Sequence, residues 1–154
     1  MKEKVYSIDN YWDMTVIEGI ADYNGKPYYY TNIFSESEDE WTNEYLLTPL
    51  PEDIFTLGLK IWNYWLYWLK TYNHTKVPHQ GEYAKQRENH SPDFLMKVDI
   101  ETDEWLKAEQ NYQNQFVFDH YLKANQPTAK AKGVFNGKID GTDAFVEWTN
   151  HENL

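Results

Sequence analysis

The sequence contains no cysteine among its 154 residues. Disulfides, thiolate metal ligands and cysteine nucleophiles are therefore excluded, and the absence fits a reducing compartment. It also lacks an apolar run of the roughly 20 residues that a membrane-spanning helix needs. The most apolar window, Ile54–Leu69, is shorter and carries Lys60 and Asn63. No apolar stretch follows Lys2 and Lys4, so we expect neither a signal peptide nor a membrane anchor, and a cytoplasmic location.

Positive charge is scarce. The chain has 14 Lys and Arg residues against 25 Asp and Glu residues, which gives a net charge of −11. The imbalance is concentrated in residues 1–55, where 3 lysines face 12 acidic residues for a net charge of −9. The negative electrostatic field of such a charge distribution repels nucleic acid phosphates. We therefore expect no direct nucleic acid binding, whereas a basic protein is an acceptable partner.

Recognisable motifs for catalysis and ligand binding are missing as well. The sequence has no glycine-rich dinucleotide loop, P-loop or G-x-S-x-G, and its five histidines form no H-E-x-x-H. Residues 136–147 have the spacing of a calcium loop, but Lys138 stands at the third position, where an oxygen ligand is required. We predict no catalytic residue, no metal site and no cofactor, and a non-enzymatic role fits better than an enzymatic one.

Aromatic residues are abundant, at 18% of the chain, and some of them mark a β-hairpin. Met14–Tyr23 is rich in β-branched residues, and Tyr28–Phe34 continues with tyrosines after Asn24 and Gly25. Asn-Gly supplies both positive φ angles that a type I′ turn requires. The pattern predicts two antiparallel strands joined at this dipeptide.

A third strand is predicted over Glu44–Thr48, with a helix directly after it. Pro51 suits the first helical position, and Glu52 and Asp53 complement the positive end of the helix dipole. Apolar residues then recur at helical spacing over Ile54–Leu69, in a stripe so wide that we expect a central helix.

A second long helix is predicted to begin at Thr102, which can cap it, and to end before Pro127. Trp105, Ala108, Tyr112 and Phe116 are predicted to share one face of this helix.

Strand patterning returns over Ala131–Asn136 and Asp143–Thr149, with turn signals between them. The order is thus strands, two helices and strands. It predicts a single α+β domain over residues 1–154, in which an antiparallel sheet packs against two long helices. That sheet would comprise the N-terminal hairpin, the third strand and the C-terminal hairpin.

Several of these features occur together within residues 14–72. They are the run Gly19–Pro27, an acidic stretch that ends in Trp41, the segment Leu47–Pro49 and the Trp-rich helix. In this combination the chain resembles a group of small uncharacterised bacterial proteins, a domain of unknown function. The resemblance implies a bacterial cytoplasmic origin and assigns no activity or site residue.

The best candidate surface lies just after the hairpin. Its residues are Glu36, Glu38, Asp39, Glu40 and Trp41. Acids beside an exposed tryptophan suit a basic partner, because the charges steer the encounter and the ring anchors the complex. Our leading hypothesis is therefore an acidic protein-interaction module, such as an inhibitor or immunity-type protein, with its oligomeric state left open.

Two alternatives remain. The first is a small-molecule-binding protein or small enzyme with an aromatic pocket between sheet and helix, lined by Glu18, Tyr28, Tyr30 and Trp65. Glu18 is included because it lies among apolar residues on its strand. The second is a housekeeping domain without a separable site.

Overall fold

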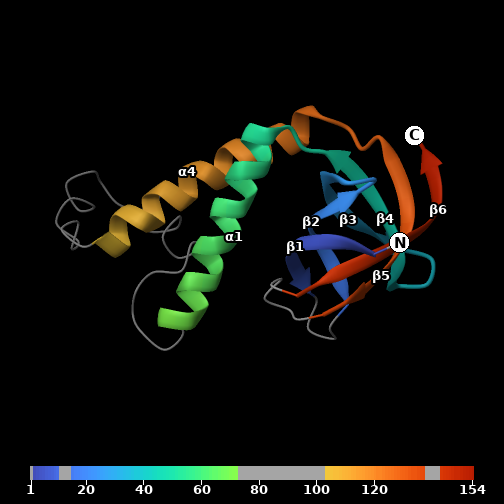
Figure 1. Ribbon diagram of the computed structural model, residues 1–154, viewed down its shortest axis with the longest axis horizontal. Helices are drawn as coiled ribbons and strands as arrows, with labels where there is room; N and C mark the ends of the chain where they lie inside the picture. Colours follow the sequence, from blue (N-terminus) through green and yellow to red (C-terminus); the bar gives the residue numbers. More distant parts are fainter. Residues whose placement is uncertain (1, 11–14, 73–102, 138–142) are drawn as a thin grey trace. The chain divides into compact units, whose positions relative to one another are not determined.

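A computed structural model describes residues 2–10, 15–72, 103–137 and 143–154 (Figure 1). The chain divides into two compact units, which we treat separately: Met1–Thr56 with Tyr121–Leu154, and Leu57–His120. The elements are β1 (Lys2–Asn10), β2 (Val16–Tyr23), β3 (Lys26–Ser35), β4 (Glu40–Pro49), α1 (Glu52–Tyr72), α4 (Asp103–Ala124), β5 (Ala129–Asn136) and β6 (Phe145–Asn153).

The six strands form a closed antiparallel barrel in which each strand pairs with the next and β1 pairs with β6. The expected α+β fold, an open sheet packed against two long helices, is therefore wrong. The sequence patterns did not predict β1. Residues Lys2–Lys4 of this strand pair with Phe145–Glu147 of β6. A sheet that closes on itself buries its apolar face in its own interior, so it needs no helical layer for that purpose.

Aromatic rings fill much of the barrel interior. The rings of Tyr30, Tyr45, Phe135 and Trp148 contact one another at centroid distances of 4.9 to 6.2 Å. Gly133 makes room for this cluster, since a Cβ atom there would lie 2.7 Å from the Trp148 ring. The high aromatic content of the chain is thus explained in part by a narrow barrel, whose interior large side chains can fill.

The predicted Asn24-Gly25 hairpin is confirmed. β2 and β3 pair antiparallel on either side of it, and the two turn residues have φ angles of 54° and 76°. The Glu3 carboxylate of β1 accepts hydrogen bonds from both turn amides, at 3.0 Å from Asn24 N and 2.7 Å from Gly25 N. This contact fixes the turn to the neighbouring strand.

The middle of β2, at Gly19–Ala21, is buried on both faces, which explains why its sequence alternates poorly. Ala21 and Tyr23 belong to the barrel core. Ile20 points to the opposite face and is still only 2% exposed. Apolar residues therefore occupy both parities of this strand.

The predicted helices are present at nearly the predicted bounds. α1 begins at Glu52, and the Asp53 carboxylate accepts a hydrogen bond from Ile54 N. In α4, two residues of the predicted shared face differ, because Ala108 is buried whereas Phe116 is 65% exposed. The buried positions of α4 also include two asparagines, Asn111 and Asn114, which a hydrophobicity pattern cannot identify. Neither described helix combines the length and apolar character needed to cross a membrane.

Candidate partner-binding site

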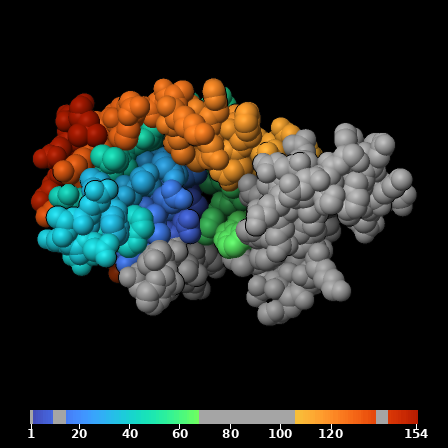
Figure 2. All heavy atoms as spheres, turned by 180° about the vertical axis from the view of Figure 1, so that it is seen from behind, coloured from blue at the N-terminus to red at the C-terminus, as the bar shows by residue number. Residues whose placement is uncertain are grey.

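The β3–β4 hairpin extends further than the strand pairing on either side of it. Pairing of β2 with β3 reaches Thr31, and pairing of β4 with β5 starts at Glu44. In the ladders of the described strands, the pairs within residues 33–43 are Phe34 with Trp41 and Ser35 with Glu40, both between β3 and β4, and we call this segment the arm. Its atoms, cyan in Figure 2, form part of the molecular surface.

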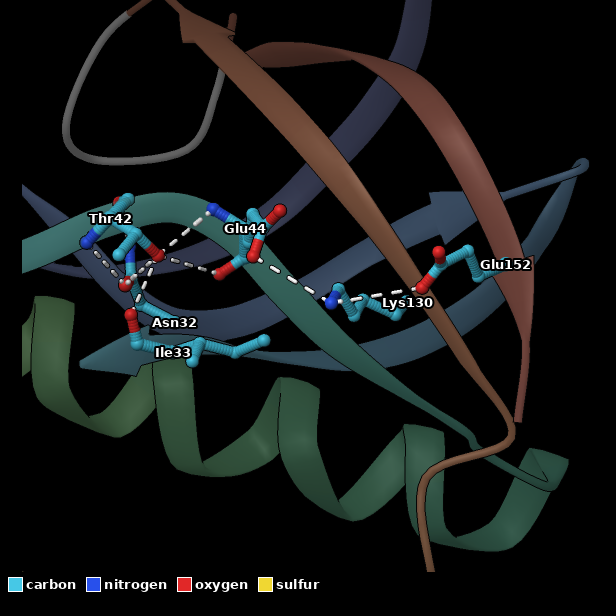
Figure 3. A network of polar contacts seen from close by, with 6 residues as sticks. All are labelled: Asn32, Ile33, Thr42, Glu44, Lys130 and Glu152. Atoms are coloured by element: carbon cyan, nitrogen blue, oxygen red, sulfur yellow. Dashed lines mark hydrogen bonds and ion pairs between the residues drawn. The ribbon is translucent and has the colours of Figure 1, made fainter. Parts of the chain in front are cut away.

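A network of side-chain hydrogen bonds holds the base of the arm (Figure 3). The buried Asn32 side chain accepts from Thr42 N at 3.1 Å and donates to Thr42 O at 2.6 Å. The Thr42 hydroxyl donates to Ile33 O at 2.6 Å and accepts from Glu44 N at 3.1 Å. These bonds replace backbone pairing where the β3–β4 register shifts, so the arm leaves the barrel in a defined direction.

One face of the arm carries an aromatic pair. Phe34 and Trp41 are paired across the two strands, and their rings meet edge to face at 5.0 Å. By strand alternation this face continues the one that holds Tyr30 and Tyr45 inside the barrel. In the barrel those rings are buried, whereas Phe34 is 40% exposed.

The tip of the arm carries the acids. Glu36, Glu38, Asp39 and Glu40 are all exposed. A hydrogen bond with Glu38 and the charge of that residue raise the pKa of Glu40. Asp39 adopts a φ of 53°, and the Ser35 hydroxyl accepts a hydrogen bond from Glu38 N, so the turn is well defined. The acids are thus crowded, and a nearby cation would relieve their mutual repulsion.

All five residues predicted to bind a partner therefore lie on one short hairpin. Trp41 is half-buried rather than freely exposed, because it packs against Phe34. Phe34 was not among the residues predicted from the sequence to bind a partner. A register for the β3–β4 hairpin would have identified it as the cross-strand neighbour of Trp41.

Glu18, Tyr28 and Tyr30 of the predicted pocket do not share one face of the sheet. Tyr30 is fully buried in the barrel, and Tyr28 packs against the same core. Glu18 lies on the opposite face of the sheet, where its carboxylate accepts a hydrogen bond from the Tyr29 hydroxyl. Trp65 belongs to the other compact unit and is 36% exposed.

Comparisons of the chain with family models, curated proteins and solved structures each gave no match. Within the described ranges, His, Asp and Glu side chains form no group of three that could hold a metal ion. Lys138 of the calcium-loop spacing, and the histidines at 74, 79 and 90, lie outside those ranges. The arm is therefore the candidate site that the geometry defines best.

Proposed function

We propose that the chain is a protein-interaction module that binds a basic protein through the arm, in the manner of an inhibitor or immunity-type protein. The observation that carries the proposal is the position of four exposed acids at the tip of a hairpin that also presents an exposed aromatic ring. Charge and apolar surface thus occur together on one projecting element.

The two features have complementary roles in binding. Exposed acids raise the association rate with a basic surface and select against acidic proteins. They contribute little affinity by themselves, because salt screens exposed ion pairs. Phe34 and Trp41 provide apolar area that a partner can cover, and aromatic rings are frequent hot spots at interfaces.

The test uses a variant that removes three tip charges and a control variant that removes three exposed charges elsewhere. The tip variant is Glu36→Gln, Glu38→Gln and Asp39→Asn. The control variant is Glu52→Gln, Glu147→Gln and Asp9→Asn, all at exposed positions. Each chain is immobilised, and proteins captured from a bacterial lysate are identified at low and at physiological salt.

We expect the native chain and the control variant to retain the same basic proteins, and the tip variant to lose them. Retention should weaken as salt rises, because the encounter is electrostatic. Captured proteins that are not basic, or that the tip variant retains equally well, would contradict the proposal.

A further inference from the structure

The turn between β2 and β3 consists of an exposed and chemically reactive dipeptide, Asn24-Gly25. It lies at the other end of β3 from the arm. A backbone nitrogen can attack the side chain of a preceding asparagine when the residue that carries the nitrogen is small, and glycine offers the least hindrance. The chain has one other Asn-Gly pair, at Asn136 and Gly137. The turn is therefore a candidate site of covalent modification that needs no enzyme.

The modification is the conversion of asparagine to aspartate or isoaspartate through a cyclic imide. The Gly25 nitrogen gives its proton to hydroxide and forms a bond to the carbonyl carbon of the Asn24 side chain. The bond from that carbon to the side-chain nitrogen breaks, and the nitrogen leaves as ammonia after it takes up a proton from water. Water then opens the ring at either carbonyl, which gives aspartate or isoaspartate. The rate therefore depends on how freely the Gly25 amide loses its proton.

The Glu3 carboxylate of β1 holds the nitrogen that performs this attack. One of its oxygens, Oε1, accepts a hydrogen bond from Gly25 N at 2.7 Å, and Oε2 accepts one from Asn24 N at 3.0 Å. A hydrogen bond to the neutral amide stabilises that form, and a negative charge beside it disfavours the amide anion. The carboxylate therefore opposes the first step of the reaction at the reacting atom.

The backbone conformation of the turn opposes ring closure as well. Asn24 and Gly25 have φ angles of 54° and 76°, in the left-handed region. The five-membered imide constrains the ψ angle of the asparagine to values outside that region, so the turn must open before the ring can form. Because Glu3 bonds to both turn amides, it opposes this opening too. One side chain thus acts on both the proton loss and the backbone rotation.

We propose that Asn24 is a site of spontaneous conversion to aspartate and isoaspartate, and that the Glu3 carboxylate sets the rate by holding the Gly25 amide. The inference is independent of the arm and of any partner. Isoaspartate would add a methylene group to the backbone of a two-residue turn that fixes the β2–β3 register. Both products place a new carboxylate near Glu3, and like charges repel. The converted chain would therefore lose the contact that fixes this turn to β1.

The test follows conversion at Asn24 by peptide mapping with mass spectrometry, at mildly alkaline pH and physiological temperature. Mapping also separates this site from the second pair at Asn136. The full-length native chain is compared with the full-length Glu3→Gln variant. A synthetic peptide of residues 21–28 gives the rate of conversion without the fold.

Two further full-length variants serve as controls. Glu147→Gln removes an exposed acid from the strand that pairs with β1. Asn32→Ala is expected to lower the stability of the barrel away from the turn, because Asn32 bonds to Val16 and Thr42. This second control separates an effect of global unfolding from an effect of the Glu3 contact.

The native chain should convert at Asn24 at least about tenfold more slowly than the peptide, because the folded turn must open first. Glu3→Gln should convert roughly three- to tenfold faster than the native chain, since a neutral amide accepts more weakly and carries no charge. Both control variants should stay within about twofold of the native rate, because local opening of the turn needs no global unfolding.

Three results would overturn the proposal. The first is a native chain that converts as fast as the peptide. The second is a Glu3→Gln variant that converts no faster than the native chain, or that does not convert while the peptide does. The third is a rate that rises as much in Asn32→Ala as in Glu3→Gln, because global unfolding would then control the reaction.

Discussion

The side chain of Asn32 bonds to Thr42 through both ends of its carboxamide, accepting from the Thr42 amide and donating to the Thr42 carbonyl. The carboxamide thus acts as a peptide group from a neighbouring strand would. The same nitrogen also lies 3.2 Å from Val16 O, so Asn32 connects β2, β3 and β4 at the point where the arm begins.

Replacing Asn32 with alanine should destabilise the barrel by about 2 kcal/mol, because the part-buried amide and carbonyl of Thr42 lose their partners. In urea unfolding, this loss of stability appears as a lower midpoint concentration, with little change in the dependence of the unfolding free energy on urea concentration. The matched control is Asn43→Ala at an exposed position on β4, which should stay within about 0.5 kcal/mol of the native chain. Equal effects at the two positions would show that the carboxamide network contributes no stability.

Gly19→Ala should destabilise the protein by roughly 3 kcal/mol or more. A Cβ atom at Gly19 would collide with the backbone carbonyl of Ser7 and lie 2.6 Å from the Tyr30 hydroxyl, which donates a hydrogen bond to that carbonyl. The comparison is Gly25→Ala, where a Cβ atom meets nothing within 4 Å but φ is +76°. That change should cost only about 1 kcal/mol of backbone strain. Gly19 also has a positive φ, of +158°, so the difference between the two variants in thermal unfolding reports what the steric collision adds to backbone strain.

Replacing Glu3 with glutamine should lower stability by about 0.5–1 kcal/mol, since a neutral amide accepts more weakly from the two turn amides. The amides of Asn24 and Gly25 should also exchange faster with solvent, by several-fold. A control is Glu147→Gln, an exposed acid on the strand that pairs with β1. If amide hydrogen exchange at Asn24 and Gly25 is unchanged in the Glu3→Gln variant, the turn is stable without the carboxylate.

The protein should lose stability above pH 10. Burial, followed by the hydrogen bond to Asp22 and the charge of that residue, raises the pKa of Tyr6 to about 12. The unfolded chain releases this proton near pH 10, while the folded chain keeps it, so the stabilisation is complete below pH 10 and is lost as pH rises toward 12. Tyr6→Phe should therefore lose less stability between these pH values than the native chain does. Parallel melting curves for the two proteins would contradict this assignment.

Burial also raises the pKa of Tyr30 well above its ordinary range. Spectrophotometric titration should accordingly show tyrosines that ionise only as the fold is lost. A titration of all tyrosines near pH 10, with the fold intact, would argue against a closed aromatic interior.

Local signals in the sequence identified several elements correctly. Asn24-Gly25 specifies its turn by the φ angles that these residues accept. Glu52 and Asp53 mark the start of α1 through the helix dipole. Both features depend on interactions between residues that are close in the chain, which sequence patterns report well.

Closure of the barrel could not be inferred in the same way. It depends on the pairing of Lys2–Lys4 with Phe145–Glu147, at opposite ends of the sequence. β1 consists mostly of polar residues, with Val5, Tyr6 and Ile8 as its apolar or aromatic ones, so it lacks a strong strand signal. The exposure of Phe116 was missed for a related reason, because helical spacing does not reveal which side of a helix tertiary contacts will cover.

The candidate site was predicted in part. Composition located the acids and Trp41, because charge clustering is visible in the sequence. The pairing of Trp41 with Phe34 and the role of Asn32 depend on the register of β3 and β4. Counting outward from the tip gives the Phe34–Trp41 pair, but the register shifts between Asn32 and Phe34, so counting does not give the contacts of Asn32.

The β1–β6 pairing has a consequence for synthesis of the protein on the ribosome. β1 is translated before its partner β6, and among the described residues four strands and two helices are translated between them. Until β6 emerges, β1 and β5 each have an edge without its eventual partner. A nascent chain in this state is vulnerable to aggregation, and the barrel can close only after β6 has been translated.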